Sequence, residues 1–528
     1  MVEQQRVTAP KSIRSATDSS WWLFCLSVLA LKFLLLAVDP LPKLFLGDSK
    51  SYLFTAIFGW IPRDRSFFYG YVIRLVSIWT ASLTPLLILQ AFLGAIIAII
   101  VAWICRAIFD LPRTFSYLFG FLCSIDPLQL AWERYVMTET CSLFFYALVL
   151  QQSFVYLRDR RITTLLVIQI LSVITIGFRM SFLIVIEVMA VALPLIVFVA
   201  GIQPTEMAAA VSQPRLQFLK RALFWRHLAA SIVTMFLLDQ GYQHANGFLS
   251  HREPAHIYGT GYFLLAIWAP ALQPRDAADP RLREIIEHGS EFELRNIRAR
   301  AHQRFSEGYL VDRWRHAETD PRQSGEIATR TALNALRRDP VAVIGLAAKT
   351  YRAFWSGRFK KSIATEDLGM GRSLTDFDRK LLAERFHWAT GSELDPKPQP
   401  FPTSYSIAAL LPGIPPILLE LLYFVALNLP EPQTLTTWYY VSASPYFFLV
   451  LLSPVLSLVL LFAARNKAYA LLLLVHTVVL LATTFLLSIA PIPRYLHPLS
   501  LLTLLSLALA VRTLLDWRSV AQNEDTSP

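Results

Sequence analysis

The sequence is poor in charge. Only 16% of its 528 residues are Asp, Glu, Lys or Arg, whereas 55% are hydrophobic. A soluble domain carries about 25% charged residues, so an ordinary water-exposed surface over the whole chain is excluded. The formal net charge is +11. The positions of the basic residues are more informative than this sum, because Lys and Arg mark the cytoplasmic loops of membrane proteins. We therefore expect membrane lipids among the partners and no nucleic acid.

Cysteine is also scarce, since the chain has four (Cys25, Cys105, Cys123 and Cys141), all inside or beside apolar runs. No C-x-x-C pair, zinc spacing or disulfide framework occurs, so the cysteines are expected to be small hydrophobic residues of helices. H-x-x-x-H, EF-hand and P-loop patterns are likewise missing. The sequence thus gives no support to a bound metal ion or nucleotide, and no cofactor is predicted.

What the chain has instead is a series of apolar runs long enough to cross a bilayer. The first, Trp21–Val38, leads to Asp39-Pro40-Leu41-Pro42 rather than to a small-residue cleavage site, which indicates a retained helix. The further runs are Leu83–Ile108, Phe115–Trp132, Thr138–Leu157, Ile162–Phe178, Phe182–Gly201, His227–Gln243, Ile407–Leu429, Trp438–Ala464, Ala468–Ile489 and Leu496–Leu515. These runs predict an all-α polytopic membrane protein with about 10–12 transmembrane helices.

The basic clusters orient these helices. Arg106 with Arg113, the turn 158–161 and the stretch 220–226 follow the second, fourth and sixth runs, so they are expected in the cytoplasm. The alternate loops, including 39–82 and the polar stretch after Ala245, then face outward. Eleven crossings cannot place both termini inside, so either Ile407–Leu429 fails to cross or the amphipathic segment Pro340–Trp355 crosses. We favour the first alternative, because Lys349 and Arg352 suit an interfacial helix.

Four regions follow from this pattern. Residues 1–244 form an N-terminal membrane module whose first outer loop is 39–82, and residues 245–406 form a large extracytoplasmic insertion with interfacial helices. Residues 407–517 supply the C-terminal transmembrane helices, and 518–528 are expected to be a disordered tail. Outer loops of this length tend to carry function.

The first outer loop holds one group of candidate residues. Asp48 lies near the outer interface, where a carboxylate is suited to act as a general base; its alternative is the N-cap of a helix that begins at Ser49. Arg63 and Arg65 can bind a phosphate beside Tyr69, which contacts a sugar or an acyl chain, or else anchor the loop to lipid headgroups.

The other outer turns hold the remaining candidates. Glu133 and Glu139 stand beside very apolar helices, where a carboxylate is costly unless it faces a wet cavity or a partner; Glu133 can also pair with Arg134, and Glu139 can favour a helix N-terminus. Arg179 either binds an anionic headgroup or extends to the surface. Arg494, Tyr495 and His497 lie in a turn framed by prolines, where the cation is suited to a phosphate and the histidine to the interface.

These motifs occur in a particular order. They are Gly47-Asp48-Ser49, the segment 65–69, the turn from Asp126-Pro127 to Thr138-Glu139, Phe178-Arg179, and Arg494-Tyr495 before the last helix. Together they resemble the class C (GT-C) integral-membrane glycosyltransferases, nearest to the bacterial protein-mannosyltransferase-like and aminoarabinose-transferase-like groups. The resemblance covers most of Trp21–Phe182 and Ser488–Trp517. The insertion matches only in position and in its amphipathic helix.

The resemblance implies a polyprenyl-phosphate-linked sugar donor and a lipid, glycan or protein acceptor on the outer face of a bacterial inner membrane. It implies that Asp48 binds or deprotonates the acceptor, and that Arg63, Arg179 and Arg494 stabilise the departing phosphate. Glu133 or Glu139 stands near the family's second acidic position. Ser49 replaces the acid that often follows the first-loop Asp, which leaves open both a divalent-metal-assisted variant and the identity of the second acid.

Two other functions remain open. An O-antigen polymerase or ligase has a similar number of spans and relies on Arg and His of its long outer loop, here His251 and Arg252. A lipid or glycan transporter carries charges at mid-membrane and shows inverted repeats with broken helices. Here Lys32 and Asp239 are the few charged residues within the predicted spans, and most charges lie at the outer face.

Overall fold

The structure is a computed structural model, and it describes residues 19–40, 42–43, 45–78, 83–199, 222–355, 439, 443–490 and 492–525. Within these ranges the chain is helical and has no β-strand, apart from one parallel bridge between Lys43 and Tyr135. The predicted run Ile407–Leu429 lies outside the described residues, as does part of the insertion.

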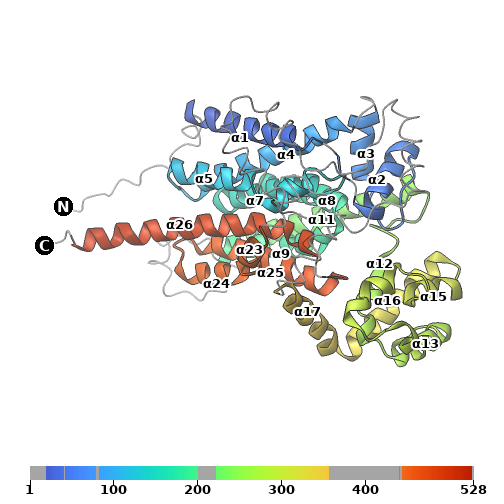
Figure 1. The fold of residues 1–528 in the computed structure, drawn as a ribbon. Helices are drawn as coiled ribbons and strands as arrows, with labels where there is room; N and C mark the ends of the chain where they lie inside the picture. The colour runs from blue at the N-terminus through green and yellow to red at the C-terminus, as the bar shows by residue number, and fades with distance from the viewer. Residues whose placement is uncertain are drawn as a thin grey trace.

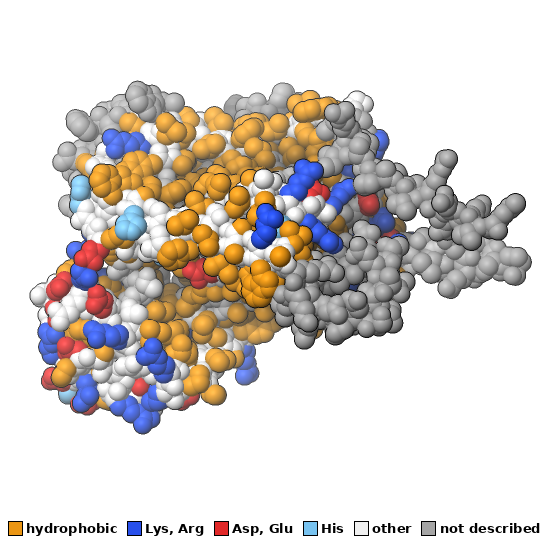
Figure 2. Space-filling view, turned by 180° about the vertical axis from the view of Figure 1, so that it is seen from behind, with side chains coloured by type: hydrophobic (Ala, Val, Ile, Leu, Met, Phe, Trp, Pro, Cys, Tyr) orange, Lys and Arg blue, Asp and Glu red, His pale blue; other side chains and the backbone are white. Residues whose placement is uncertain are grey.

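Seven described helices are long and apolar enough to cross a membrane, and three shorter apolar ones accompany them (68–78, 162–178 and 453–463). The seven are Ser19–Val38, Thr84–Ile108, Glu139–Asp159, Met180–Phe198, Ala222–Ser250, Lys467–Leu487 and Arg494–Ser519. Figure 2 shows a broad belt of hydrophobic side chains over this part of the molecule, with charged side chains gathered beyond it. The predicted all-α polytopic membrane fold is confirmed.

The helices of the membrane module run side by side along one direction (Figure 1). They are α1 (Ser19–Val38), α4 (Thr84–Trp103), α5 (Arg113–Ser124), α6 (Pro127–Trp132), α7 (Glu139–Asp159), α8 (Ile162–Phe178), α9 (Leu183–Val199), α11 (Ala222–Ser250), α23 (Ser444–Leu451), α24 (Ser453–Ala463), α25 (Lys467–Leu487) and α26 (His497–Asp525). One large hydrophobic core joins them.

Two predicted runs are divided rather than continuous. Phe115–Trp132 becomes α5 and α6, because Asp126 caps α6 by accepting a hydrogen bond from the Gln129 amide at 2.9 Å and Pro127 opens the new helix. At 12 residues, α5 is about 18 Å long, short of the ~30 Å hydrocarbon core. Trp438–Ala464 is interrupted at Leu452, where Pro454 starts α24.

The first outer loop folds into α2 (Leu46–Phe58) and α3 (Phe68–Ile73), which continues as a π-helical turn over Arg74–Ile78. The bridge holds the loop start to the turn before α7, with Lys43 N donating to Arg134 O and Val136 N to Lys43 O. Ser49 Oγ accepts from Phe45 N at 2.7 Å and donates to Val136 O at 2.9 Å. Asp48 therefore lies inside the first turn of α2, and the predicted N-cap alternative is wrong.

The insertion has a hydrophobic core of its own. Its helices are α12 (Thr260–Ile267), α13 (Pro280–Glu287), α14 (Arg300–Phe305), α15 (Leu310–Ala317), α16 (Pro321–Arg338) and α17 (Pro340–Phe354). Figure 1 shows α12, α13, α15 and α16 as a lobe at the same end of the molecule as α2 and α3, opposite the C-terminal end of α26. α17 connects this lobe to α25.

The insertion docks onto the end of α25 through polar contacts. Trp268 Nε1 donates to Leu486 O at 3.2 Å, and Arg300 Nη1 donates to Ser488 O at 3.2 Å. Arg300 is 2% exposed and also donates to Thr350 Oγ1 at 2.8 Å and to Ile297 O at 3.0 Å. Burial lowers the pKa of Arg300 to about 10, so the guanidinium keeps its charge at neutral pH.

Arg300→Met should loosen the insertion from the membrane module. The substitution leaves buried oxygens of Ser488 and Thr350 unpaired, and each lost hydrogen bond to a charged group costs about 1.5–3 kcal/mol. We expect faster limited proteolysis of the insertion in the detergent-solubilised protein. Arg298→Met, at an exposed position of the same segment, is the matched control and should leave the proteolysis rate unchanged.

Two predicted boundaries shift. α11 continues to Ser250, so the membrane module runs past residue 244 and into the predicted insertion. α26 continues to Asp525, so residues 518–525 are helical and the prediction of a disordered tail from residue 518 is wrong. Before this extension, Arg512 and Asp516 of α26 form an ion pair one turn apart, with 3.0 Å between N and O.

Candidate functional site

A charged cluster gathers at the end of the membrane module that carries α2 and α3 (Figure 1), which the sequence predicts to face outward. Arg494, in the short turn before α26, lies with Nη1 3.2 Å from Asp48 Oδ2 and with Nε 3.7 Å from Glu139 Oε1. Arg179, which follows α8, lies 3.9 Å from the same Glu139 oxygen. Arg65 forms an ion pair with Asp48 Oδ1. We call these five residues the outer charge cluster.

The cluster joins segments that lie far apart in the sequence. Asp48 comes from the first turn of α2 and Arg65 from the loop after it. Glu139 is the first residue of α7, Arg179 ends α8, and Arg494 precedes α26. The bridge between Lys43 and Tyr135 ties the first two segments to the start of α7, so the backbone itself fixes the distance between Asp48 and Glu139.

The two carboxylates of the cluster differ in their solvent exposure. The Asp48 side chain is 14% exposed and Glu139 is 2% exposed, whereas the three arginines lie between 10% and 20%. Glu139 Oε2 and Arg179 Nη1 have no hydrogen-bond partner among the described residues. Asp48 is therefore reachable from solvent, whereas Glu139 is buried beside Arg179 and Arg494.

The charges of the cluster are nearly balanced. Three guanidinium groups meet the carboxylates of Asp48 and Glu139, and Asp64 lies 4.0 Å from Arg65 Nη2, so the net charge is about zero if all six groups are ionised. Burial works to lower the pKa of Arg65, but the Asp48 carboxylate, with smaller contributions from Tyr52 and Asp64, raises it above its usual value. The guanidinium thus stays charged at any physiological pH.

Aromatic rings line the cluster. The guanidinium of Arg494 lies 4.8 Å from the Phe45 ring centroid and 5.4 Å from that of Tyr495, and Arg65 lies 5.7 Å from the Tyr52 ring. Burial raises the pKa of Tyr52, so its hydroxyl remains protonated and can donate. These contacts restrict the arginine side chains.

A second, fully buried polar group lies beneath the cluster. Lys32 Nζ of α1 is 2.6 Å from Glu133 Oε1, which also accepts from Gln129 Nε2 at 2.8 Å. His497 Nε2 in turn donates to Gln129 Oε1 at 2.7 Å. Both members of the ion pair are 0% exposed. We call these four residues the buried polar group.

The predicted site residues therefore divide. Asp48, Arg65, Glu139, Arg179 and Arg494 come together, and Tyr495 contacts Arg494. Glu133 and His497 belong to the buried polar group, where neither reaches solvent. Tyr69 is buried and donates its hydroxyl to Gln90 Oε1 at 2.6 Å, and the Arg63 carbonyl accepts from Tyr258 N of the insertion.

Three members of these networks are not predicted as site residues from the sequence. Lys32 stands out only as an unusual charge within a span, and nothing in the sequence distinguishes Gln90 or Gln129. A neutral amide in an apolar helix is an ordinary occurrence, and its partners are set by packing. Lys32 and Glu133 are 101 positions apart, and Gln129 and His497 are 368 apart. The cost of a charge within a membrane span was the one usable signal for Lys32.

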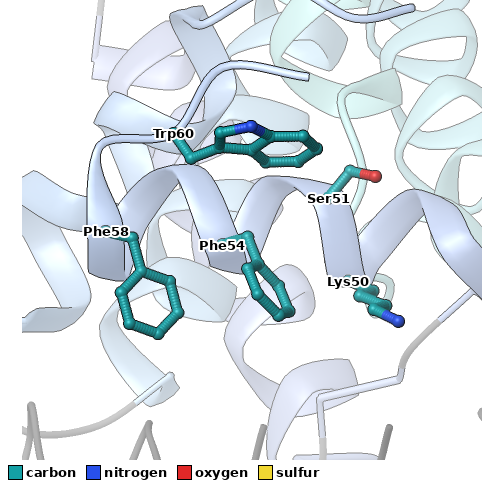
Figure 3. A pocket seen from close by; sticks show the side chains of 5 residues that line it. All are labelled: Lys50, Ser51, Phe54, Phe58 and Trp60. Atoms are coloured by element: carbon teal, nitrogen blue, oxygen red, sulfur yellow. The ribbon is translucent and has the colours of Figure 1, made fainter. Parts of the chain in front are cut away.

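An apolar groove of about 450 Å³ runs along the opposite side of α2. Lys50, Ser51, Phe54, Phe58 and Trp60 line it, and Figure 3 shows these side chains arranged along α2 and the turn that follows. Asp48 and Tyr52 are four residues apart and share the inward face of the helix, whereas Phe54 and Phe58 share the groove face. One short helix thus presents a polar site on one side and a hydrophobic surface on the other.

No protein family model matches the chain, and no curated protein matches it. Among solved structures, it is similar to the cryo-EM structure of the arabinosyltransferase EmbB from Mycobacterium smegmatis, with a TM-score of 0.31 and 12% sequence identity. The match covers 89% of this chain and 42% of that one. The chain thus spans less than half the length of that protein, and a similarity of this size says nothing about activity.

Proposed function

We propose that this chain is a GT-C-type membrane glycosyltransferase. It moves a sugar from a polyprenyl-phosphate-linked donor to a lipid, glycan or protein acceptor at the extracytoplasmic face of a bacterial inner membrane. The observation that supports this proposal is the convergence of Arg65, Arg179 and Arg494 on the Asp48 and Glu139 carboxylates. The order of motifs that resembles the family supplies the reaction type.

In this reaction the acceptor hydroxyl or amine attacks the anomeric carbon of the sugar and gives its proton to Asp48. The bond between that carbon and the phosphate oxygen breaks, and the electron pair leaves with the polyprenyl phosphate. Negative charge therefore builds up on the leaving oxygen, where Arg494 and Arg179 stabilise it. Glu139 holds both arginines near this position, and the groove along α2 offers an apolar surface to a lipid chain.

Arg494→Lys should lower kcat/KM by about 10²–10³-fold, the usual effect of removing one transition-state donor. Lysine keeps the charge but loses the planar fork that reaches both Asp48 and Glu139. The measurement is transfer of labelled sugar from a synthetic polyprenyl-phosphate donor in proteoliposomes. Arg512→Lys, at the far end of α26, is the matched control, and equal rates for both variants would contradict the assignment of Arg494.

The two alternative functions make different predictions. His251 is exposed, and Arg252 stacks over the Tyr258 ring at 5.0 Å; a polymerase or ligase that uses them would lose activity in His251→Ala or Arg252→Ala. Under the proposed function both variants retain transfer. A transporter would move labelled lipid across the bilayer without forming a covalent product. Comparing envelope glycans and glycolipids with and without the gene identifies the sugar and the acceptor.

A further inference from the structure

Arg304 is the most unusual charged residue of the insertion. It lies in α14 and is 7% exposed. Its guanidinium lies 4.4 Å from the ring centroid of Phe263, 5.1 Å from that of Phe305 and 5.8 Å from that of Tyr262. Arg315, which is exposed, approaches the same Tyr262 ring to 4.6 Å. Two cations thus share one aromatic surface.

Within the described residues Arg304 has neither an ion pair nor a hydrogen bond, and its buried Nε has no partner. Other arginines of the insertion are paired. Arg338 lies 2.7 Å from Asp276, Arg313 lies 3.0 Å from Glu291, and Arg300 donates to three oxygens. A buried charge without a partner is destabilising, and among the described residues no carboxylate forms an ion pair with Arg304, so the position suits an oxyanion ligand.

The side chain faces the first outer loop. A Cβ added at Gly259 would lie 3.7 Å from Arg304 Nη2 and 3.3 Å from Asp64 Cβ, so the two segments approach each other across this glycine. The backbone continues the contact, with Tyr258 N donating to Arg63 O at 2.6 Å. Arg65, which pairs with Asp48, follows Asp64 directly. Arg304 therefore lies on the side of the insertion next to the outer charge cluster.

The charges around this position are mixed but mainly positive. Arg304, Arg315 and Arg65 are the cations, and Asp64 is the one carboxylate among the described groups that act on Arg304. Burial, followed by repulsion from Arg315, lowers the pKa of Arg304 to about 10. The group remains charged at neutral pH, and Asp64 is too distant to form an ion pair with it.

We propose that Arg304 is part of an oxyanion-binding site, which takes a phosphate or carboxylate group carried by the acceptor. A guanidinium fork binds such a group through two parallel hydrogen bonds, and the surrounding rings hold the fork in place while excluding water. The identification of the occupant as the acceptor rests on the proposed glycosyltransferase function. The binding site itself does not.

Inorganic phosphate is the first probe, measured by isothermal titration of the full chain in nanodiscs of neutral lipid at constant ionic strength. Arg304→Gln should weaken binding about 10–100-fold, the effect of losing a charged hydrogen-bond donor, and Arg304→Lys should weaken it less. Arg313→Gln is the matched control, because Arg313 also stacks on a ring, Phe292 at 4.7 Å, but is paired with Glu291. It should bind phosphate as the unaltered chain does.

Two further arms distinguish the source of the oxyanion. Competition by glucose 1-phosphate indicates a glycan phosphate, and competition by nanodiscs that contain phosphatidylglycerol indicates a lipid headgroup. If Arg304→Gln fails to fold, the comparison uses the unaltered chain and Arg304→Lys, with phosphate raising the melting temperature of the first more than that of the second. Phosphate binding that is absent, or equal in all variants, overturns the proposal.

Failure here is separable from failure of the proposed function. Phosphate binding at Arg304 is measured without a donor, as the difference between the unaltered chain and Arg304→Gln, so phosphate held by the outer charge cluster cancels from the comparison. If phosphate binds at Arg304 but no sugar is transferred, the proposed glycosyltransferase function fails. If sugar is transferred but phosphate does not bind at Arg304, the proposed oxyanion site fails.

Discussion

Asp48→Asn is expected to lower the rate of sugar transfer by about 10²–10⁴-fold, the range for removing a general base. The amide keeps the size of the carboxylate but cannot take the acceptor proton. Both Asp48 oxygens face arginines, Arg65 and Arg494, and the side chain is 14% exposed. An acceptor can therefore reach it.

The measurement is single-turnover transfer in proteoliposomes with saturating donor, which separates the chemical step from binding. Glu253→Gln is the control, because Glu253 is a carboxylate of the same outer region that is 65% exposed and paired only with other surface groups. Expression, detergent extraction and melting temperature should be the same for both variants. Undiminished transfer by Asp48→Asn would remove Asp48 from the mechanism.

The membrane fold was predictable because hydropathy reports the solvent of each segment directly. Ten of the expected spans coincide with described helices or helix pairs. The breaks at Asp126 and Pro454 were harder to predict, since an apolar run gives no indication of where a cap or a proline redirects the backbone. The extension of α26 to Asp525 was not predicted for a related reason, because charged residues are compatible with both a helix and a coil.

The candidate site was predictable in part. Asp48, Glu139, Arg179 and Arg494 were selected because ionisable groups next to apolar helices are costly, and these four meet in one cluster. Glu133 was selected by the same argument, yet it lies in the buried polar group. Sequence cannot distinguish these two fates, because the difference depends on whether a lysine 101 positions away packs beside it. Arg304 carried no sequence signal at all.

Removing Lys32 from the buried polar group should destabilise the protein strongly. In Lys32→Met the Glu133 carboxylate keeps its hydrogen bond from Gln129 and its ion pair with Arg134 Nη1 at 3.9 Å, but it loses its partner at 2.6 Å, within a site that is 0% exposed. Breaking a buried ion pair in this way costs about 3–5 kcal/mol. Glu133 also packs closely against α4, since a Cβ added at Gly94 would overlap Glu133 Oε1.

The loss should also reach the outer charge cluster. Gln129 links Glu133 to His497, and His497 begins the helix that directly follows the turn of Arg494. Lys32→Met is therefore expected to reduce transfer as well as the melting temperature in detergent, whereas Ser27→Ala, at an exposed hydroxyl of the same helix, should change neither.

The double variant Lys32→Met with Glu133→Gln tests whether charge is the cause. It removes both charges and keeps an acceptor for Gln129, but it also removes the carboxylate that lies 3.9 Å from the buried Arg134 guanidinium. It should therefore recover part of the stability that the single variant loses, because replacing both members of a buried pair is often neutral whereas Arg134 loses one counter-charge. A double variant as unstable as Lys32→Met alone would show that packing around Lys32, rather than an uncompensated carboxylate, holds α1 to α6. In that case Lys32→Met and the double variant would show equally low transfer rates and equally low melting temperatures, although residue 133 is charged in only one of them.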